Sequence, residues 1–445
     1  MNPTSDDSNV TLLRTVREHG VQVVCLQHTD MLGRVWEITV PATGLEKALA
    51  EGVVLDGEAA RGAASNRETE RCWLPDPATF ALLPPQLGGT RAARFICDVR
   101  MLDGTPWPGS PRSVLARAMD EAAAMGFGYY VAPEIEFFLL PMEVATASRL
   151  AIVGKGVGSY DRTIGEENWR RELLTVLEAL GIPVGAGYHE VAGGQHEIDL
   201  GFAEALAAAD HLIVCRYTLQ VLARQQGMCA TFMPKPLMGC AGSGMHVHQY
   251  LTDAATGGNA FADLDDPYGL SEVGRQFIAG QLLHARGMAA VLAPLVNSYK
   301  RLVPGHEAPI LVGWGRGNQS ALMRVPRSLR PADTRIELRC PDPSCNPYLA
   351  LAVMLHCGLD GIRRGLELGR PLDENLSEAD WARVGFASLP GTLWEALEEL
   401  GRDQVVQDAL GPEICQQLCA AKRAEWIDYS LEVTPWERAR YLGIF

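Results

Sequence analysis

Two carboxylates stand two residues apart within an otherwise apolar run, VAPEIEFFLL, at residues 131–140. Side chains alternate between the two faces of a strand, so Glu134 and Glu136 are expected to point one way while Ile135 and Phe137 point the other. Two like charges on one face repel each other unless that face is solvated or holds a cation. A solvated face is the commoner explanation for an isolated E-x-E pattern, so the rest of the chain must decide between water and a metal ion.

Four further segments place acids or histidines among strand-forming residues. They are GYHEVAGGQHEIDL (187–200), GSGMHVHQYL (242–251), VNSYKRLVPGHEAP (296–309) and RIELRCPDPSCNPYLA (335–350). Each of them alone has an ordinary structural explanation, because buried polar side chains are normally satisfied by hydrogen bonds. Together with the first run they supply five carboxylates and one imidazole: Glu134, Glu136, Glu190, Glu197, Glu337 and His246.

This set of candidate ligands favours hard divalent cations. Oxygen ligands with a single nitrogen suit Mg²⁺ or Mn²⁺ better than Zn²⁺, and six ligands are enough for two such ions. The chain also carries a group of arginines in or between these segments: Arg301, Arg324, Arg335 and Arg339. Two metal ions beside arginines can neutralise the charge of a phosphoryl group transferred from ATP. The usual glycine-rich phosphate loop is missing from the sequence, so metals and arginines would have to hold the nucleotide.

The elements that must position these residues form two parts. Residues 10–20 predict a short helix, residues 21–41 a hairpin around Leu32 and Gly33, and residues 45–52 a second helix. The proline- and glycine-rich segment DGTPWPGSPRSV (103–114) indicates a boundary. We therefore expect a small mixed domain at 1–105 and a larger one at 106–445.

The larger part alternates helices with strands. Helices are predicted at 113–126 and 168–181, and turn-linked strands cluster at 183–251 and 307–340. From about Asn346 the chain is predicted to be almost wholly helical. Clustered strands favour an antiparallel α+β fold over a doubly wound parallel sheet.

Composition excludes several classes of function. Apolar residues make up 47% of the chain, charged residues 21%, and the formal net charge is -15. This charge argues against nucleic acid or an anionic membrane surface as a partner. No apolar run reaches membrane-spanning length, the first residues carry charges unlike a signal peptide, and the eleven cysteines include no C-x-x-C pair. We expect a cytoplasmic protein with reduced thiols.

An ordered set of motifs resembles the glutamine synthetase family, type I branch. The motifs are PEIEFF, HEVAGGQHEI, TFMPKP, GSGMHVH, NSYKRLVPGHEAP and RIELRCPD followed by NPYLA, and they extend over most of the chain. The resemblance implies a small β-grasp-like N-terminal domain and a catalytic domain with a curved antiparallel sheet. It also implies an active site between neighbouring subunits of a homo-oligomer, commonly a dodecamer of two hexameric rings.

The resemblance further implies a role for each matching residue. One metal ion would be held by Glu136, Glu190 and Glu197, and the second by Glu134, His246 and Glu337. Glutamate would be bound by Arg301, Arg339 and Gly242. The nucleotide and its phosphates would be near His248, Arg324, Arg335 and the position of Gln319. The incoming amine would be bound and deprotonated by Asp56, from a neighbouring subunit, and by Glu307.

The implied reaction has two steps. The γ-carboxylate of L-glutamate attacks the γ-phosphoryl group of ATP and forms γ-glutamyl phosphate. A nitrogen nucleophile then displaces phosphate. Water must be excluded, because it would hydrolyse the acyl phosphate.

The sequence departs from the family pattern mainly on the side of the amine. The family's D-G-S-S segment appears as LDGEAARG (55–62), which keeps Asp56 but puts Glu58 and Ala59 in place of the serines. Glu70 stands where an aspartate is usual. The family's N-R-S appears with Gln319 in place of the arginine, and Tyr160 is the candidate for the tyrosine of a Y-F-D motif.

Two further changes concern the nucleotide. Ala241 precedes the Gly-Ser-Gly where asparagine is frequent, and Tyr250 stands in place of a serine after the second histidine. The C-terminal part lacks the tyrosine that some bacterial members use for adenylylation, so regulation by that route is not expected.

These departures favour a glutamate–amine ligase that uses an amine larger than ammonia. A polyamine attracted by Glu58 and Glu70, an alkanolamine or another primary amine all remain open. The first alternative is a true glutamine synthetase that uses ammonia and has drifted at these positions. The second is a non-catalytic structural or regulatory relative, which the complete set of metal-ligand positions argues against.

Overall fold

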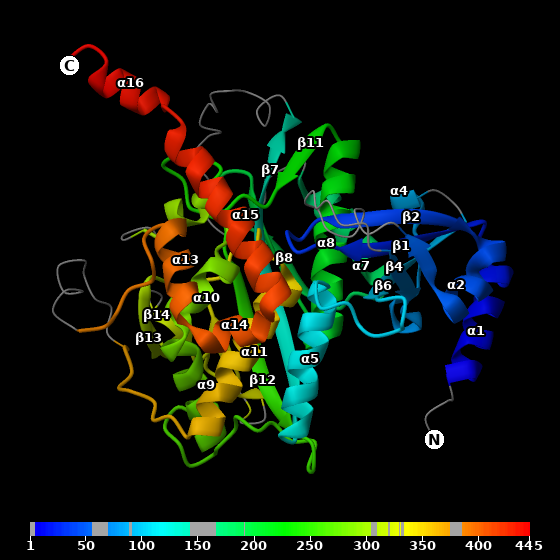
Figure 1. The fold of residues 1–445 in the computed structure, drawn as a ribbon, viewed down its shortest axis with the longest axis horizontal. Coiled ribbons are helices and arrows are strands. Elements are labelled where there is room, and N and C mark those ends of the chain that lie inside the picture. The colour runs from blue at the N-terminus through cyan, green and yellow to red at the C-terminus, as the bar shows by residue number, and fades with distance from the viewer. Residues whose placement is uncertain are drawn as a thin grey trace.

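The computed structural model of the chain describes residues 5–55, 70–88, 91–142, 166–190, 192–303, 309–318, 321–328, 330, 333–373 and 385–445. Within these residues the fold is α+β, as the sequence predicts, and contains two separate sheets (Figure 1). None of the helices in these ranges has the length and apolar character needed to cross a membrane.

The first sheet has six strands in the order β2-β1-β6-β4-β3, with β5 paired to β6. Its strands are β1 (Val23–Thr29), β2 (Val35–Pro41), β3 (Val53–Leu55), β4 (Arg71–Pro75), β5 (Ala81–Leu82) and β6 (Ala92–Arg100). The predicted hairpin is confirmed: β1 and β2 pair antiparallel, and Gly33 in the connection has φ 80°. The pair β1–β6 is parallel, so the sheet is mixed.

Two helices cover one face of this sheet. α1 (Ser5–Glu18) and α2 (Leu45–Glu51) pack with Val24, Leu26 and Phe95 in a separate small core. α2 ends at Gly52, whose φ of 72° is accessible to glycine at little cost. A short helix, α4 (Pro85–Gly88), and two 3₁₀ turns, η1 (Ala42–Gly44) and η2 (Pro77–Thr79), complete this part.

The second sheet has nine strands in the order β13-β14-β15-β12-β7-β9-β8, with β10 and β11 both paired to β7. Its strands are β7 (Phe127–Pro141), β8 (Val184–His189), β9 (Gln195–Leu200), β10 (Ala203–Glu204), β11 (Met228–Thr231), β12 (Met245–Asp253), β13 (Leu311–Gly315), β14 (Ala321–Arg324) and β15 (Ile336–Leu338). All pairs are antiparallel except β13–β14. The central strand, β7, has 15 residues and bonds to four other strands.

Apart from the second sheet, this part of the chain consists mainly of helices, several of which pack against the apolar face of the sheet. The helices are α5 (Pro111–Ala124), α7 (Glu166–Ala179), α8 (Ala205–Gln225), α9 (Glu272–Leu283), α10 (Ala285–Leu292), α11 (Pro347–Arg364), α13 (Leu393–Arg402), α14 (Gln404–Leu410), α15 (Pro412–Leu431) and α16 (Pro435–Tyr441), with the 3₁₀ turn η3 (Val296–Lys300). The helical C-terminal part is confirmed. The strand cluster expected at 183–251 is wrong in its middle, because α8 lies there with 21 residues. The short apolar runs of α8 contain β-branched residues. The spacing of apolar residues alone does not distinguish such runs in a buried helix from a strand.

One buried arginine joins the first sheet to the helices of the second. Arg112, at the start of α5, is 5% exposed. Its guanidinium donates to Asp76 Oδ2 at 2.7 Å, to Asp98, and to both carboxylate oxygens of Asp210 on α8 at 3.1 and 2.9 Å. Tyr348, in α11, donates to the same Asp210 at 2.6 Å. One cation thus compensates three carboxylates from both parts of the chain.

Replacing Arg112 by methionine tests this junction. Arg112→Met keeps much of the side-chain length but leaves the three carboxylates without their common cation, so we expect a loss of about 3–5 kcal/mol in the free energy of unfolding. The measurement is urea denaturation followed by circular dichroism. Lys47→Met is the control, since Lys47 forms only an exposed ion pair with Glu51 and should change stability by less than about 0.5 kcal/mol. Equal midpoints for the two variants would contradict the prediction.

Candidate active site

Strand register brings the predicted ligands onto one face of the second sheet. Glu134, on β7, is paired with His246 on β12 and with Asp199 on β9. Glu136 is paired with Glu197 on β9. Paired residues of neighbouring strands point to the same side of a sheet, so these five side chains share one face.

The same face continues toward the edge of the sheet. His248, two residues after His246, is paired with Glu337 on β15, and Glu337 is paired with Arg324 on β14. The alternate residues, including Ile135, Phe137, Ile198, Val247 and Leu338, are all fully buried in the main core. The expectation that Glu134 and Glu136 point away from a packed face is therefore confirmed.

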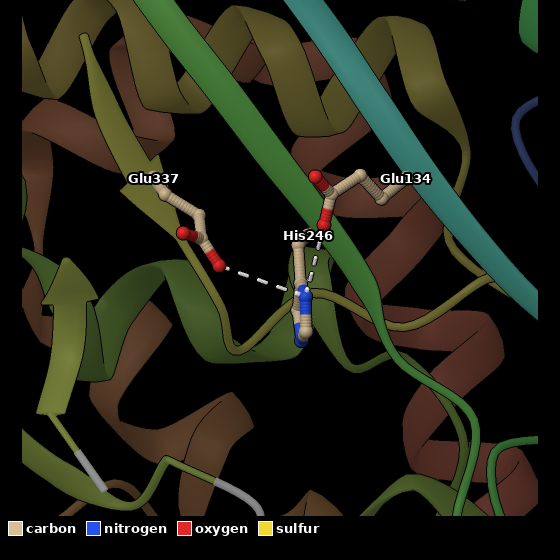
Figure 2. A group of neighbouring side chains, drawn as sticks. All are labelled: Glu134, His246 and Glu337. Atoms are coloured by element: carbon tan, nitrogen blue, oxygen red, sulfur yellow. Dashed lines mark ion pairs between the residues drawn. The ribbon is translucent and has the colours of Figure 1, made fainter. Parts of the chain in front are cut away.

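Glu134, His246 and Glu337 converge from three adjacent strands (Figure 2). His246 Nδ1 lies 3.4 Å from Glu134 Oε2 and 3.6 Å from Glu337 Oε1. One potential ligand atom from each residue lies within 4.8 Å of the others. Two carboxylates and one imidazole at this spacing fit a divalent cation that prefers oxygen and accepts one nitrogen.

Glu136, Glu190 and Glu197, the ligands predicted for the other cation, are arranged less tightly. Glu136 Oε2 accepts hydrogen bonds from Gly244 N at 3.0 Å and from Gln195 Nε2 at 3.1 Å. Burial raises the pKa of Glu136, and the nearby charge of Glu190 acts in the same direction. Within the described residues, the second group of ligand atoms at metal-binding spacing consists of Glu134, Glu197 and Asp199, without Glu136 or Glu190.

Sequence reasoning missed Asp199. It follows Glu197 by two residues in the strand QHEIDL, so the same alternation that linked Glu134 to Glu136 predicts that Asp199 lies on the ligand face. The signal was therefore present in the sequence.

The carboxylates of this face perturb one another strongly. Burial and the charge of Glu136 raise the pKa of Glu197 to about 10, although a hydrogen bond from Tyr188 acts in the opposite direction. Burial and the charge of Glu134 also raise the pKa of Asp199. Burial also tends to raise the pKa of Glu134. Hydrogen bonds with His246 and His248 outweigh this effect and hold the pKa of Glu134 well below the ordinary range. Carboxylates crowded in this way are stabilised by a bound cation, which supports the fit.

The two histidines of the GMHVH motif differ in their partners. His248 Nε2 lies 2.6 Å from Glu134 Oε1, and its Nδ1 accepts from Arg335 Nε at 3.4 Å. His246 instead points its Nδ1 between the two glutamates. His246 is thus the imidazole at the cluster, and His248 connects the cluster to Arg335.

Three of the four predicted arginines flank the cluster. Arg324 Nε lies 2.6 Å from Glu337 Oε2, and Arg339 Nε lies 3.2 Å from Glu337 Oε1. With Arg335 beside His248, they concentrate positive charge next to the acidic residues. An anionic substrate could contact the arginines on one side and cations held by the acidic residues on the other.

The fourth arginine, Arg301, is buried and forms hydrogen bonds with the backbone that follows β15. Its guanidinium donates to the carbonyls of Arg339, Cys340 and Pro341 at 3.0–3.2 Å. A Cβ on Gly242 would lie 2.6 Å from Pro234 O, and one on Gly244 would lie 2.3 Å from Arg301 Nη2. The Gly-Ser-Gly sequence therefore allows the close approach of Arg301.

Only one of the residues predicted for the amine lies within the described part of the chain. Asp56, Glu58, Tyr160, Glu307 and Gln319 fall outside the described residues. Glu70 is described and is exposed immediately before β4, in the first sheet and not in the cluster on the second.

Comparison with protein-family models identifies both parts of the chain. Residues 20–101 match the model described as "Glutamine synthetase, beta-Grasp domain", and residues 108–441 match "Glutamine synthetase, catalytic domain".

Curated relatives and solved structures agree with these matches. The chain is 42% identical to a glutamine synthetase of Thermus thermophilus over 447 residues, covering 98% of each chain. It is 41% identical to a glutamine synthetase of Methanosarcina mazei over 438 residues, covering 97% of each. A solved GmaS/ADP complex superposes with a TM-score of 0.88 at 32% identity, covering 97% of this chain and 99% of that one. The chain therefore belongs to the glutamine synthetase family of ATP-dependent ligases, as the resemblance in its sequence predicts.

Proposed function

We propose that the enzyme joins L-glutamate to an amine other than ammonia, with ATP as the second substrate and γ-glutamyl phosphate as the intermediate. The observation that supports this most is the ligand face of the second sheet, where most of the residues proposed to hold the cations are in register from β15 to β9. The departures from the family pattern gather instead at Asp56 to Glu70 and at Gln319. Activation is thus retained while the acceptor side is altered.

We propose two divalent cations, Mg²⁺ or Mn²⁺, at this face. Glu134, His246 and Glu337 would hold one. Glu136, Glu190 and Glu197 would hold the other, with Asp199 as an added carboxylate beside Glu197. When bound, the two ions would offset the charge of the transferred phosphoryl group.

The protein's own residues would orient the substrates and remove a proton from the amine. Arg324 and Arg335 would orient the phosphates, and Arg339 and Arg301 the carboxylates of glutamate, so that the γ-carboxylate faces the γ-phosphoryl group. The γ-carboxylate oxygen attacks phosphorus and ADP leaves. Glu307 and Asp56 would then remove a proton from the acceptor, because a protonated amine is not nucleophilic, and the free amine displaces phosphate from the acyl carbon. The similarity to a GmaS structure solved with ADP supports a nucleotide site in this fold.

A true glutamine synthetase is the second candidate function. The names and the identity of 40–42% of the curated relatives favour it. It differs from the first proposal only in the acceptor, so both share one assay.

We also propose a cytoplasmic homo-oligomer, in the form of a dodecamer of two hexameric rings. The C-terminal segment supports an assembly, because α16 extends away from the body of the molecule (Figure 1) and exposes apolar side chains. Trp436 is 62% exposed and Phe445 is 99% exposed. Exposed apolar surface of this kind typically marks a protein contact. The eleven cysteines, all free thiols, agree with a reducing compartment.

The acceptor is tested by phosphate release with glutamate, Mg²⁺-ATP and single amines, including ammonia, alkylamines, alkanolamines and polyamines. We expect at least one primary amine to give a kcat/KM about tenfold or more above that of ammonia, because the acceptor pocket has lost the family's residues. Turnover with ammonia alone would establish the glutamine synthetase instead. Absence of turnover with every amine would favour the non-catalytic relative.

The position of Gln319 is tested by restoring the family's arginine. Gln319→Arg adds a positive charge and length at a position that the family resemblance places near the transferred phosphate. We therefore expect the ratio of kcat/KM for ammonia to that for the preferred amine to rise. Gln220→Arg, at an exposed position of α8, is the control. An unchanged ratio in Gln319→Arg would show that this residue does not select the acceptor.

The predicted metal ligands are tested with Glu337→Gln. This change keeps the shape of the side chain but removes a buried negative charge, so Mn²⁺ affinity measured by calorimetry should fall about tenfold or more. Glu204→Gln on β10, which is exposed on the same sheet, should bind as the unaltered protein does. Equal affinity in both variants would exclude Glu337 as a ligand.

A further inference from the structure

The second face of the first sheet encloses a cavity. Val24, Leu26 and Phe95 point to the face covered by α1 and α2, so the alternate residues of β1, β2 and β6 point toward α8. The cavity there has a volume of about 160 Å³. Its polar lining comes from the sheet and from one residue of α8: Cys25, Gln27, Glu37, Thr39, Arg94 and Tyr217. Figure 1 shows this sheet, in blue, beside α8, in green.

Arg94 is a buried cation that forms no ion pair with a carboxylate within the described residues. It lies on β6 and is 5% exposed. Its Nη1 donates to Thr79 O at 3.5 Å, and its Nε has no hydrogen-bond partner within the part of the chain that the structure describes. Asp210 lies close enough to favour the charged form of Arg94 but is already bound by Arg112 and Tyr348. A buried guanidinium in this situation is stabilised by an added anion.

Glu37 supplies the opposite charge at the same cavity. It is exposed on β2, and its Oε2 accepts a hydrogen bond from Gln27 Nε2 at 2.8 Å. Arg94 is paired with Cys25, and Glu37 is paired with Gln27, which lies two residues further along β1. From the spacings of a sheet, the Cα atoms of Arg94 and Glu37 are about 12 Å apart. The two long side chains therefore leave room for a small molecule between their charged ends.

We infer that this cavity binds a small zwitterion that carries a carboxylate and an amine, such as an α-amino acid. The carboxylate pairs with the buried guanidinium of Arg94, and the ammonium group faces Glu37 and Gln27. The volume corresponds to roughly five water molecules at about 30 Å³ each, which suits a small amino acid. The site is separate from the ligand face of the second sheet and does not depend on the proposed reaction.

The ligand would connect two parts of the molecule. Arg94 and Glu37 belong to the first sheet, whereas Val214 and Tyr217 belong to α8. A molecule that contacts both stabilises their packing, since it binds only the folded arrangement. The occupied protein should therefore unfold at a higher temperature than the empty one.

Calorimetric titration and thermal unfolding test this site in the full-length protein without ATP. Each protein amino acid except glutamate is tested alone. We expect at least one to bind and to raise the unfolding temperature. Arg94→Gln and Glu37→Gln should each weaken its affinity by about tenfold or more, because each removes one of the two charge pairs. Arg34→Gln, which alters an exposed arginine of the β1–β2 connection, should leave the affinity unchanged.

Three outcomes would overturn the proposal. They are no binding of any amino acid to the unaltered protein, binding that survives Arg94→Gln, and binding that is lost in Glu337→Gln but kept in Arg94→Gln, which would locate it at the metal cluster. If the protein binds the amino acid and the corresponding carboxylic acid without an amine equally well, Glu37 does not bind the ammonium group. If circular dichroism shows that Arg94→Gln does not fold, the affinity of the Glu37→Gln variant, which alters an exposed residue, tests the proposal instead.

Discussion

The row of acidic side chains at the centre of the candidate site depends on the register of β7 with its neighbours β12 and β9. Glu134 meets His246 on one side and Asp199 on the other, and Glu136 meets Glu197. Because side chains alternate along a strand, a shift by one residue would turn this entire row into the core and expose Ile135 and Phe137. Those residues are fully buried, so the hydrophobic effect that packs one face also fixes the register of the other.

This register concentrates negative charge that the protein compensates only in part. His246 and His248 lie against Glu134, and the charges of Arg324 and Arg339 offset that of Glu337. Among the described residues Glu197 forms no ion pair with a cation, and burial together with the charge of Glu136 raises its pKa. A purely structural role would favour apolar residues at these positions, since burying unpaired carboxylates costs free energy. The excess of negative charge is instead what a site for divalent cations requires.

Local patterns predicted much of this arrangement, and long-range contacts account for what they missed. The period of two in PEIEFF was enough to place Glu134 and Glu136 on one face, and the Leu32-Gly33 turn was enough for the first hairpin. The interior of 183–251 was misassigned because the short apolar runs of α8 suit a strand as well as a buried helix. No local pattern in the sequence predicted the ion pairs of Arg112 either. Its three carboxylates lie at positions 76, 98 and 210, and only folding brings them together.

The location of the sequence departures has a physical reason. The residues predicted to activate glutamate lie mainly on strands, where a change would disturb both register and packing. Asp56 and Glu58 follow the end of β3 at Leu55, and Gln319 lies between β13, which ends at Gly315, and β14, which begins at Ala321. Substitutions between strands leave the ladders and the core intact. On the proposed function, the acceptor would therefore vary at these connections while the strands keep the ligand face of the second sheet in register.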